Sequence, residues 1–223
     1  DRVLLRNINY TKGTITLDGQ EYSLTSNEFP TINPANPLEL TDEEKMLAKR
    51  LRHSFKVSEK LQRHVRLLLQ HGCMYAIYNN NLLFHASIPL NEDGSLKNVE
   101  VTPGQTLSGR KLLHNIGMLV RTAYQKDAEP EERQYAIDYF LYLWCGPNSP
   151  LFDKSIADKA THKEKKGNYF TLRDNENVVD SILDAFGVTG DNRHIINGHV
   201  PVHVANGENP IKANGKLMVI DGG

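Results

Sequence analysis

An α/β (α+β) fold with a mainly helical insertion is predicted by the order of apolar segments in this 223-residue sequence. Short β-type segments lie near both ends of the chain, and a long stretch with helical periodicity lies between them. Strands that alternate with helices are typical of α/β proteins. Four segments follow: a β-rich entry segment at 1–40, a long helix and β-hairpin at 41–87, the mainly helical insertion at 88–187, and core strands at 188–223.

The entry segment and the helix after it have clear sequence boundaries. The strand patterns "GTITL" at 13–17 and "EYSL" at 21–24 are joined by "DG", a typical hairpin turn. Thr41 and Glu44 have the spacing of a capping box, so we expect a helix to begin there. Apolar residues then recur largely on one face until Gly72, which predicts one long helix.

A second hairpin, three helices and two closing strands are expected next. The apolar strings "CMYAIY" and "LLFHAS" flank three Asn residues at 79–81, which is a turn signal. A polar, turn-rich loop is expected at 88–107. Helical patterns follow at 108–126, at 130–145 with Pro130 in first position, and near 175–186 with Gly187 as terminator. The chain closes with the strand patterns "HIING" and "KLMVI", and a loop with two histidines lies between them.

Composition limits the partners and the compartment. The formal net charge of -1 provides no overall field that would favour nucleic acid. No apolar run approaches the roughly 18 residues of a membrane helix. Cys73 and Cys145 are far apart and lie in apolar runs, so we expect buried free thiols and a cytoplasmic protein. The chain starts without Met and stops in a strand pattern, and we expect it to be a piece of a longer polypeptide.

Three of the nine histidines follow β-type segments. His85 ends "LLFH" and His199 follows "HIING", and open α/β sheets bind ligands at the carboxyl ends of their strands. Two imidazoles there could hold one metal ion, since neutral imidazole is a common ligand of transition metals. Spacing alone equally allows each ring to bond a backbone carbonyl in a turn, and both interpretations stay open. His203, on the same face of an extended segment as His199, is a further candidate metal ligand.

At these residues the sequence resembles a known family. "LLFHASIP" and "NGHVPVH" resemble the last two metal-binding motifs of the calcineurin-like metallophosphoesterases. Strings such as "SEKLQRHVRLL", "YLWCGPNSPLF", "LRDNE" and "KANGKLMVIDGG" resemble the class 3 fructose-1,6-bisphosphatases of Firmicutes and related bacteria. The resemblance runs in order over nearly the whole chain, so it is more specific than either histidine motif.

The resemblance implies part of a four-layer αββα sandwich and a phosphatase of gluconeogenesis. Such enzymes hydrolyse D-fructose 1,6-bisphosphate to D-fructose 6-phosphate and phosphate with a dinuclear centre, typically of Mn²⁺, whose second metal His85 and His199 would bind. Two cations can activate a water molecule and hold phosphoryl oxygens for in-line attack. The alternatives are another calcineurin-like phosphoesterase, acting on a protein or a dinucleotide, and a non-catalytic regulatory or oligomerisation module.

Two departures from the family pattern have consequences. No Asp-x-His, "GDxxDRG" or "GNH" motif occurs here. The first metal's ligands, the bridging Asp and the catalytic His are therefore expected upstream of Asp1, and we expect this chain to be inactive alone. The resemblance also implies a longer stretch between "SPLF" and "ATHKEKK", so either this member is shortened or residues around Ser155 and Ile156 are absent.

Basic residues are candidates for binding the second phosphate of a sugar bisphosphate, because a phosphate group requires cations or N–H donors. A solvated charge run is the more ordinary interpretation of "KEKK". The expected partner is thus the sugar bisphosphate, with neither nucleic acid nor membrane, and a homo-oligomer is left open. The candidate substrate-binding residues are Arg110, His162, Lys163, Lys165 and Lys166, with Arg52 and Arg173 as further options.

Overall fold

The computed structural model describes residues 2–17, 19–155 and 165–221. The chain divides into two compact units, Asp1–Leu68 and Leu69–Gly223. Most of the stretch between Ser155 and "ATHKEKK" lies outside the described residues, so neither a shortened member nor absent residues is tested there. Within the described ranges, every helix is too short or too polar to cross a membrane.

The first unit begins with a small antiparallel sheet. A 3-10 helix, η1 (Arg2–Asn7), leads into three strands in the order β1-β2-β3. These are β1 (Ile8–Asn9), β2 (Thr14–Leu17) and β3 (Gln20–Ser23), and β2 pairs with β3 as predicted.

The single long helix predicted up to Gly72 is wrong, because the structure has two helices. These are α1 (Asp42–Val57) and α2 (Glu59–His71). The capping box is confirmed: Thr41 Oγ1 accepts from the Glu44 N–H at 3.2 Å, and the Glu44 carboxylate accepts from the Thr41 N–H at 2.8 Å. Ser58 is extended (φ -69°, ψ 100°) and its hydroxyl accepts from the Leu61 N–H at 3.4 Å. Serine thus competes with the helical hydrogen bonds, and it ends one helix while it caps the next.

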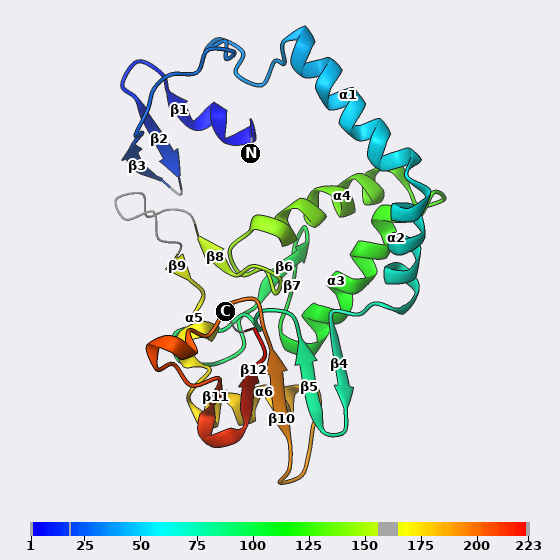
Figure 1. Cartoon of the computed structure of the whole chain (residues 1–223), viewed down its shortest axis with the longest axis vertical. Coiled ribbons are helices and arrows are strands. Elements are labelled where there is room, and N and C mark those ends of the chain that lie inside the picture. Colours follow the sequence, from blue (N-terminus) through cyan, green and yellow to red (C-terminus); the bar gives the residue numbers. More distant parts are fainter. Residues whose placement is uncertain (1, 18, 156–164, 222–223) are drawn as a thin grey trace. The chain divides into compact units, whose positions relative to one another are not determined.

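The second unit is built on a five-stranded mixed sheet with the order β11-β12-β10-β5-β4 (Figure 1). The central strand β10 runs parallel to β5 and β12, whereas the outer strands β4 and β11 are antiparallel to their neighbours. The predicted mixture of helices and strands is therefore confirmed. The strands are β4 (Tyr75–Tyr78), β5 (Asn81–Phe84), β10 (His194–Asn197), β11 (Ile211–Lys212) and β12 (Leu217–Val219).

A two-residue turn joins β4 to β5. Asn79 and Asn80 both have positive φ values, 48° and 57°, between the paired residues Tyr78 and Asn81. Two-residue hairpins with positive φ at both positions match the twist of the strands, and Asn tolerates that conformation. The turn fixes the register of β5 and thereby the position at which β5 ends.

Helices and short hairpins complete the second unit. The helices predicted at 108–126, 130–145 and 175–186 are confirmed, and Gly187 ends the last one in the left-handed conformation (φ 77°). The loop predicted at 88–107 is wrong in part, because the short segment "VEVTPGQTL" forms a hairpin of only seven strand residues. The elements are β6 (Val99–Thr102), β7 (Gln105–Leu107), α3 (Gly109–Tyr124), α4 (Pro130–Cys145), β8 (Lys154–Ser155), β9 (Lys165–Lys166), α5 (Asn168–Leu172), α6 (Glu176–Phe186), η2 (Val204–Asn206) and η3 (Ala213–Gly215).

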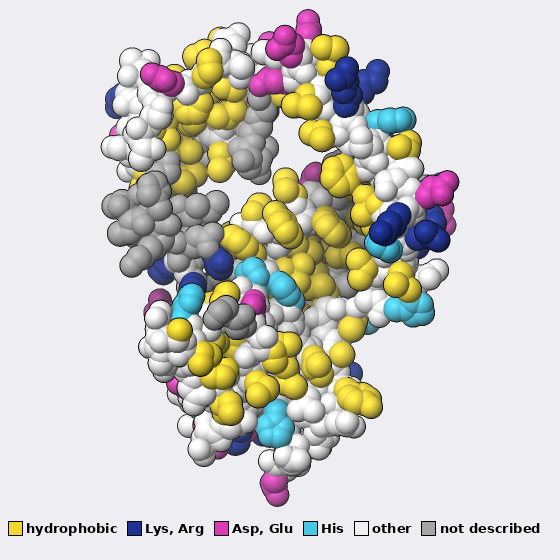
Figure 2. All heavy atoms as spheres, in the orientation of Figure 1, with side chains coloured by type: hydrophobic (Ala, Val, Ile, Leu, Met, Phe, Trp, Pro, Cys, Tyr) yellow, Lys and Arg dark blue, Asp and Glu magenta, His cyan; other side chains and the backbone are white. Residues whose placement is uncertain are grey.

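The main core lies between the sheet and the helices α3 and α6. Leu82, Ile195 and Leu217 contribute fully buried side chains from three adjacent strands, and Ile182 and Phe186 do so from α6. On α3 and α4, by contrast, apolar side chains remain on the surface, where Figure 2 shows them gathered.

The two cysteines are free, as expected, but the expectation that both are buried is wrong. Cys73 is exposed and Cys145 is only partly buried. Cys73 lies in the connection between α2 and β4, and Cys145 is the last residue of α4. An apolar run in the sequence therefore did not guarantee burial at either position.

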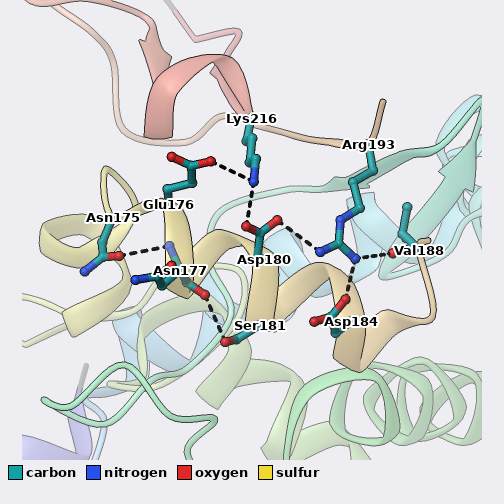
Figure 3. A network of polar contacts seen from close by, with 9 residues as sticks. All are labelled: Asn175, Glu176, Asn177, Asp180, Ser181, Asp184, Val188, Arg193 and Lys216. Carbon is teal, nitrogen blue, oxygen red and sulfur yellow. Dashed lines mark hydrogen bonds and ion pairs between the residues drawn. The ribbon is translucent and has the colours of Figure 1, made fainter. Parts of the chain in front are cut away.

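A network of charged side chains joins α6 to the starts of β10 and β12 (Figure 3). Asp180 accepts hydrogen bonds from Arg193 at 3.0 Å and from Lys216 at 2.6 Å. Lys216 also lies 2.8 Å from the Glu176 carboxylate, and Arg193 also binds Asp184. Because Arg193 and Lys216 each precede a strand of the sheet, Asp180 ties the helix to both strands.

We expect Asp180→Asn to lower the free energy of unfolding at pH 7 by about 0.5–1 kcal/mol, since it removes the charge that two cations share. Hydrogen bonds from Lys216 and then from Arg193 hold the pKa of Asp180 below its ordinary value. A carboxylate with a lowered folded pKa stabilises the protein above the unfolded pKa, near 4, and loses that contribution as the pH falls through the folded value. Urea denaturation should therefore show a deficit at pH 7 that shrinks toward pH 3.

The matched control is Asp191→Asn, because Asp191 is an exposed residue in the connection between α6 and β10. This change should alter the stability much less. A deficit for Asp180→Asn that is the same at pH 3 and pH 7 would contradict the electrostatic explanation.

Candidate metal centre

The two strand-end histidines meet at one edge of the sheet. Strands β5 and β10 are parallel neighbours with Leu83 opposite Ile196, so their carboxyl ends lie side by side. His85 is the first residue after β5, and His199 is the second after β10. The topology thus brings together two side chains that are 114 residues apart in the sequence.

Hydrogen bonds between the two loops fix this arrangement. The Gly198 N–H donates to the His85 carbonyl at 2.9 Å. The buried side chain of Asn197 donates from Nδ2 to the Ala86 carbonyl at 2.8 Å. Each histidine is therefore next to a residue that binds the opposite loop.

The imidazole rings of His85 and His199 face each other. Nε2 of His85 lies 3.2 Å from Nδ1 of His199, and the ring centroids are 5.0 Å apart. The His85 side chain is exposed, whereas His199 is half-buried and lies with its ring centroid 6.2 Å from that of Phe152. The His85 ring is thus open to solvent, and the His199 ring packs against the protein.

The separation of the two nitrogens fits two ligands of one ion. Imidazole nitrogens bind first-row metals at about 2.1 Å, so two of them on one ion lie about 3.0 Å apart at a right angle and about 3.4 Å apart at the tetrahedral angle. The distance between Nε2 of His85 and Nδ1 of His199, 3.2 Å, lies between these values. A pair of imidazoles suits transition metals better than magnesium or calcium, which prefer oxygen ligands.

The pair is not a complete metal site by itself. In the part of the chain that the structure describes, no group of three or more His, Cys, Asp or Glu side chains could hold one ion. His203 is accordingly not brought together with His85 and His199. Its backbone N–H donates to the Glu208 carboxylate at 2.9 Å, and its side chain lines a separate pocket.

The backbone at His199 has an unusual conformation. Its φ is 71°, and the Val200 N–H donates to the Gly198 carbonyl at 2.9 Å, which closes a three-residue turn around His199. Turns of this kind with positive φ are rare and strained for a residue with a Cβ atom. Such strain is often found where a functional side chain has to be oriented. At His199, the strained backbone conformation occurs together with a ring that points toward His85.

We expect His199→Gly to be more stable than His199→Ala by about 1 kcal/mol, because glycine adopts a positive φ without the steric cost that alanine carries. Both variants lose the imidazole, so the difference between them isolates the backbone. The same pair of substitutions at His203, where φ is -83°, is the control, and there Gly should have no advantage over Ala. Urea denaturation measures both pairs, and equal stabilities of the two His199 variants would rule out backbone strain at this residue.

Polar residues that the sequence did not single out lie beside the pair. Ser87 is fully buried, and its N–H donates to the Pro150 carbonyl at 3.2 Å. Asp153 follows Phe152 and is only 3% exposed, and this burial raises the pKa of its carboxyl group. A Cβ atom at Gly167 would overlap the Asp153 carboxylate oxygens, so a larger residue there would require the Asp153 side chain to move. Their burial had no signal in the sequence, because serine and aspartate usually lie on the surface.

The basic candidates for the second phosphate occupy different places. Lys166 lines a pocket of about 470 Å³, whereas Lys165 is exposed and is not part of its lining. Arg110 donates from Nε to the Tyr75 hydroxyl at 3.0 Å and from Nη1 to the Phe186 carbonyl at 3.3 Å, which is a structural role. Arg52 is an exposed residue of α1, and Arg173 lines the pocket. The candidates His162 and Lys163 lie outside the described residues.

Comparisons with known proteins agree on one family. The family described as Firmicute fructose-1,6-bisphosphatase matches residues 1–223. Curated proteins named fructose-1,6-bisphosphatase class 3 are similar to the whole chain, with 52% identity in Phocaeicola vulgatus, 52% in Parabacteroides distasonis and 51% in Alkaliphilus metalliredigens. The chain spans 35% of the length of each of these relatives. No solved structure matches the chain.

Proposed function

Since the chain belongs to the Firmicute fructose-1,6-bisphosphatase family, we propose that the natural protein hydrolyses D-fructose 1,6-bisphosphate to D-fructose 6-phosphate and phosphate, a step of gluconeogenesis. The observation that carries the proposal is the pair of imidazole nitrogens 3.2 Å apart at the carboxyl edge of two parallel strands. A paired metal-ligand geometry is what a metal-dependent phosphatase requires at such an edge.

His85 and His199 are assigned as ligands of one divalent ion, for which we propose Mn²⁺. An ion bound there would neutralise charge on the phosphoryl group and lower the pKa of a bound water molecule. The chain's own contribution is to hold Nε2 of His85 and Nδ1 of His199 in position through the strained turn and the bonds from Asn197 and Gly198. Both rings have to be neutral at these nitrogens in order to bind a metal.

We assign the remaining ligands and the proton donor of the centre to residues outside the described part of this chain. The pair supplies two nitrogens, whereas a dinuclear centre requires further ligands and a proton donor for the leaving alcohol. The relatives are about three times as long as the part of them that this chain matches, which leaves ample sequence for those groups. In the same proposal, the mixed sheet with α6 against it forms part of a four-layer αββα sandwich.

We place the protein in the cytoplasm, with a sugar bisphosphate as its partner. Both cysteines are free, which agrees with a reducing compartment. To test the compartment, the thiols of cells are trapped with acid and the oxidation state of Cys73 is measured in the extract. Cys73 suits this test because its thiol is exposed.

The test of the activity uses the full-length natural protein, first stripped of metal and then supplied with Mn²⁺. We expect phosphate release from fructose 1,6-bisphosphate that depends on the added metal. Release instead from a phosphoserine peptide or a dinucleotide would identify a different phosphoesterase. Failure to release phosphate from any of the three substrates, with metal bound, would favour a non-catalytic module.

A further inference from the structure

A positively charged pocket lies in the second unit, close in sequence to the histidine pair. Its wall includes Val200 and Pro201, which directly follow His199. It also includes Lys154, two residues after Phe152, whose ring packs beside that of His199. The pocket has a volume of about 470 Å³, which is large enough for a small anionic group.

Cations outnumber carboxylates in the lining of this pocket. It contains four lysine or arginine side chains and two acidic ones, although the chain as a whole is nearly neutral. Figure 2 shows Lys or Arg side chains over β8 and β9, which both contribute to the lining. The four cationic residues are Lys154, Lys166, Arg173 and Lys212.

Both acidic residues are engaged by the backbone. The Asp174 carboxylate accepts a hydrogen bond from the Ala213 N–H at 2.8 Å. The Glu208 carboxylate accepts from the His203 N–H at 2.9 Å, and this bond is the largest cause of the lowered pKa of Glu208. These carboxylates therefore hold the loops that form the pocket.

Arg173 distinguishes this pocket from an ordinary patch of surface lysines. Its side chain is only 8% exposed, and its Nη1 is buried without a hydrogen-bond acceptor among the described residues. The guanidinium group lies over the Phe170 ring at 5.6 Å, and the Arg173 N–H is fixed to the Tyr169 carbonyl at 2.8 Å. A buried guanidinium group is costly unless an anion pairs with it, and its fork of donors matches the oxygens of a phosphate.

We propose that this pocket binds a phosphate monoester group, namely the phosphate of the sugar bisphosphate that is not hydrolysed. Arg173 binds two of its oxygens, and Lys166 and Lys212 add charge at the rim. The identity of the substrate rests on the proposed function, whereas the affinity of the pocket for phosphate does not. In this assignment the histidine pair and the pocket bind opposite ends of one substrate.

The test compares two substrates in the full-length natural protein and its Arg173→Met variant. Arg173→Met should raise the KM for fructose 1,6-bisphosphate by about 10- to 100-fold, because a charge-assisted pair with a phosphate is lost. The kcat/KM for p-nitrophenyl phosphate, whose one phosphate occupies the metal centre, should change by less than about 2-fold, since that substrate has no group for the pocket. Equal losses on both substrates, or an unchanged KM for the bisphosphate, would overturn the proposal.

Further variants separate binding from folding. Lys166→Met changes an exposed side chain of the pocket and should raise the same KM by a smaller factor. Lys126→Met, at an exposed lysine outside the lining, is the matched control and should leave the kinetics with both substrates unaffected. Arg173→Lys keeps the charge and should recover part of the affinity if Arg173→Met is correctly folded.

A binding measurement separates this proposal from the proposed function. Isothermal titration with inorganic phosphate and with fructose 6-phosphate, in the absence of metal, should give weaker binding to Arg173→Met than to the natural protein for both ligands. If the natural protein binds phosphate through Arg173 but does not hydrolyse fructose 1,6-bisphosphate, the pocket assignment stands and the substrate assignment fails. If the two proteins bind phosphate equally, the pocket assignment fails whatever the substrate is.

Discussion

Replacement of either His85 or His199 by Ala is expected to reduce Mn²⁺-dependent phosphate release by more than about 100-fold. Loss of a residue that only supports a metal ligand costs about 10- to 100-fold in affinity or activity, and loss of a ligand itself should cost more. The two nitrogens lie 3.2 Å apart, so either substitution leaves the other imidazole as a single ligand. We therefore expect the double variant to be little worse than each single one, because the two side chains act as a unit.

Two measurements on the full-length natural protein check this expectation. Steady-state phosphate release gives the activity, and titration with Mn²⁺ gives the metal affinity, which should fall together with the activity at low metal concentration. His114→Ala is the control, because His114 is an exposed residue of α3. Full activity of either His85→Ala or His199→Ala would remove the pair from the metal centre.

Phe186→Ala should lower the free energy of unfolding of the second unit by about 3–5 kcal/mol. The Phe186 side chain is fully buried, and its ring packs edge-to-face on Tyr75 with centroids 5.0 Å apart. Removal of the ring leaves a cavity between α6 and the start of β4, which the surrounding chain fills only in part. The effect should be visible as faster hydrogen exchange of the amides of α6 and β5.

Phe140→Ala is the matched control for this prediction. Phe140 is 44% exposed on α4, so truncation of its ring should change the stability by less than about 1 kcal/mol. If both substitutions have the same small effect, the packing of α6 against the sheet does not determine the stability of the second unit.

Local signals in the sequence predicted most elements of the second unit. The fixed φ of Pro130 favours the start of a helix, and the left-handed conformation that Gly187 adopts easily favours the end of one. Both residues have these positions in the structure. A turn was also predicted at the three Asn residues 79–81, because Asn accepts positive φ. The structure has the turn at Asn79 and Asn80, and Asn81 already belongs to β5. The break at Ser58 was not predicted, because apolar periodicity continues across it and the interruption lies in the extended backbone of one residue.

The candidate site was predictable in its residue types but not in its surroundings. His85 and His199 could be placed at strand ends because each follows a short apolar run, and parallel pairing of β5 with β10 then brings them together. The burial of Asp153 and Arg173 depends on loops that pack around them, and no pattern of neighbouring residues signals it. For the same reason the sequence named basic residues as candidate phosphate ligands without an order of preference between Arg173 and Lys165.

The parallel pairing of β5 and β10 also has a consequence for the order of folding. The residues that it joins at the site are 114 positions apart, and closing a loop of that length costs on the order of 4 kcal/mol in chain entropy. The β4–β5 hairpin and the individual helices between the two strands form through local hydrogen bonds, so they should appear before the long-range pairing. The ability to capture Mn²⁺ through both imidazoles should then be among the last properties that the refolding chain acquires.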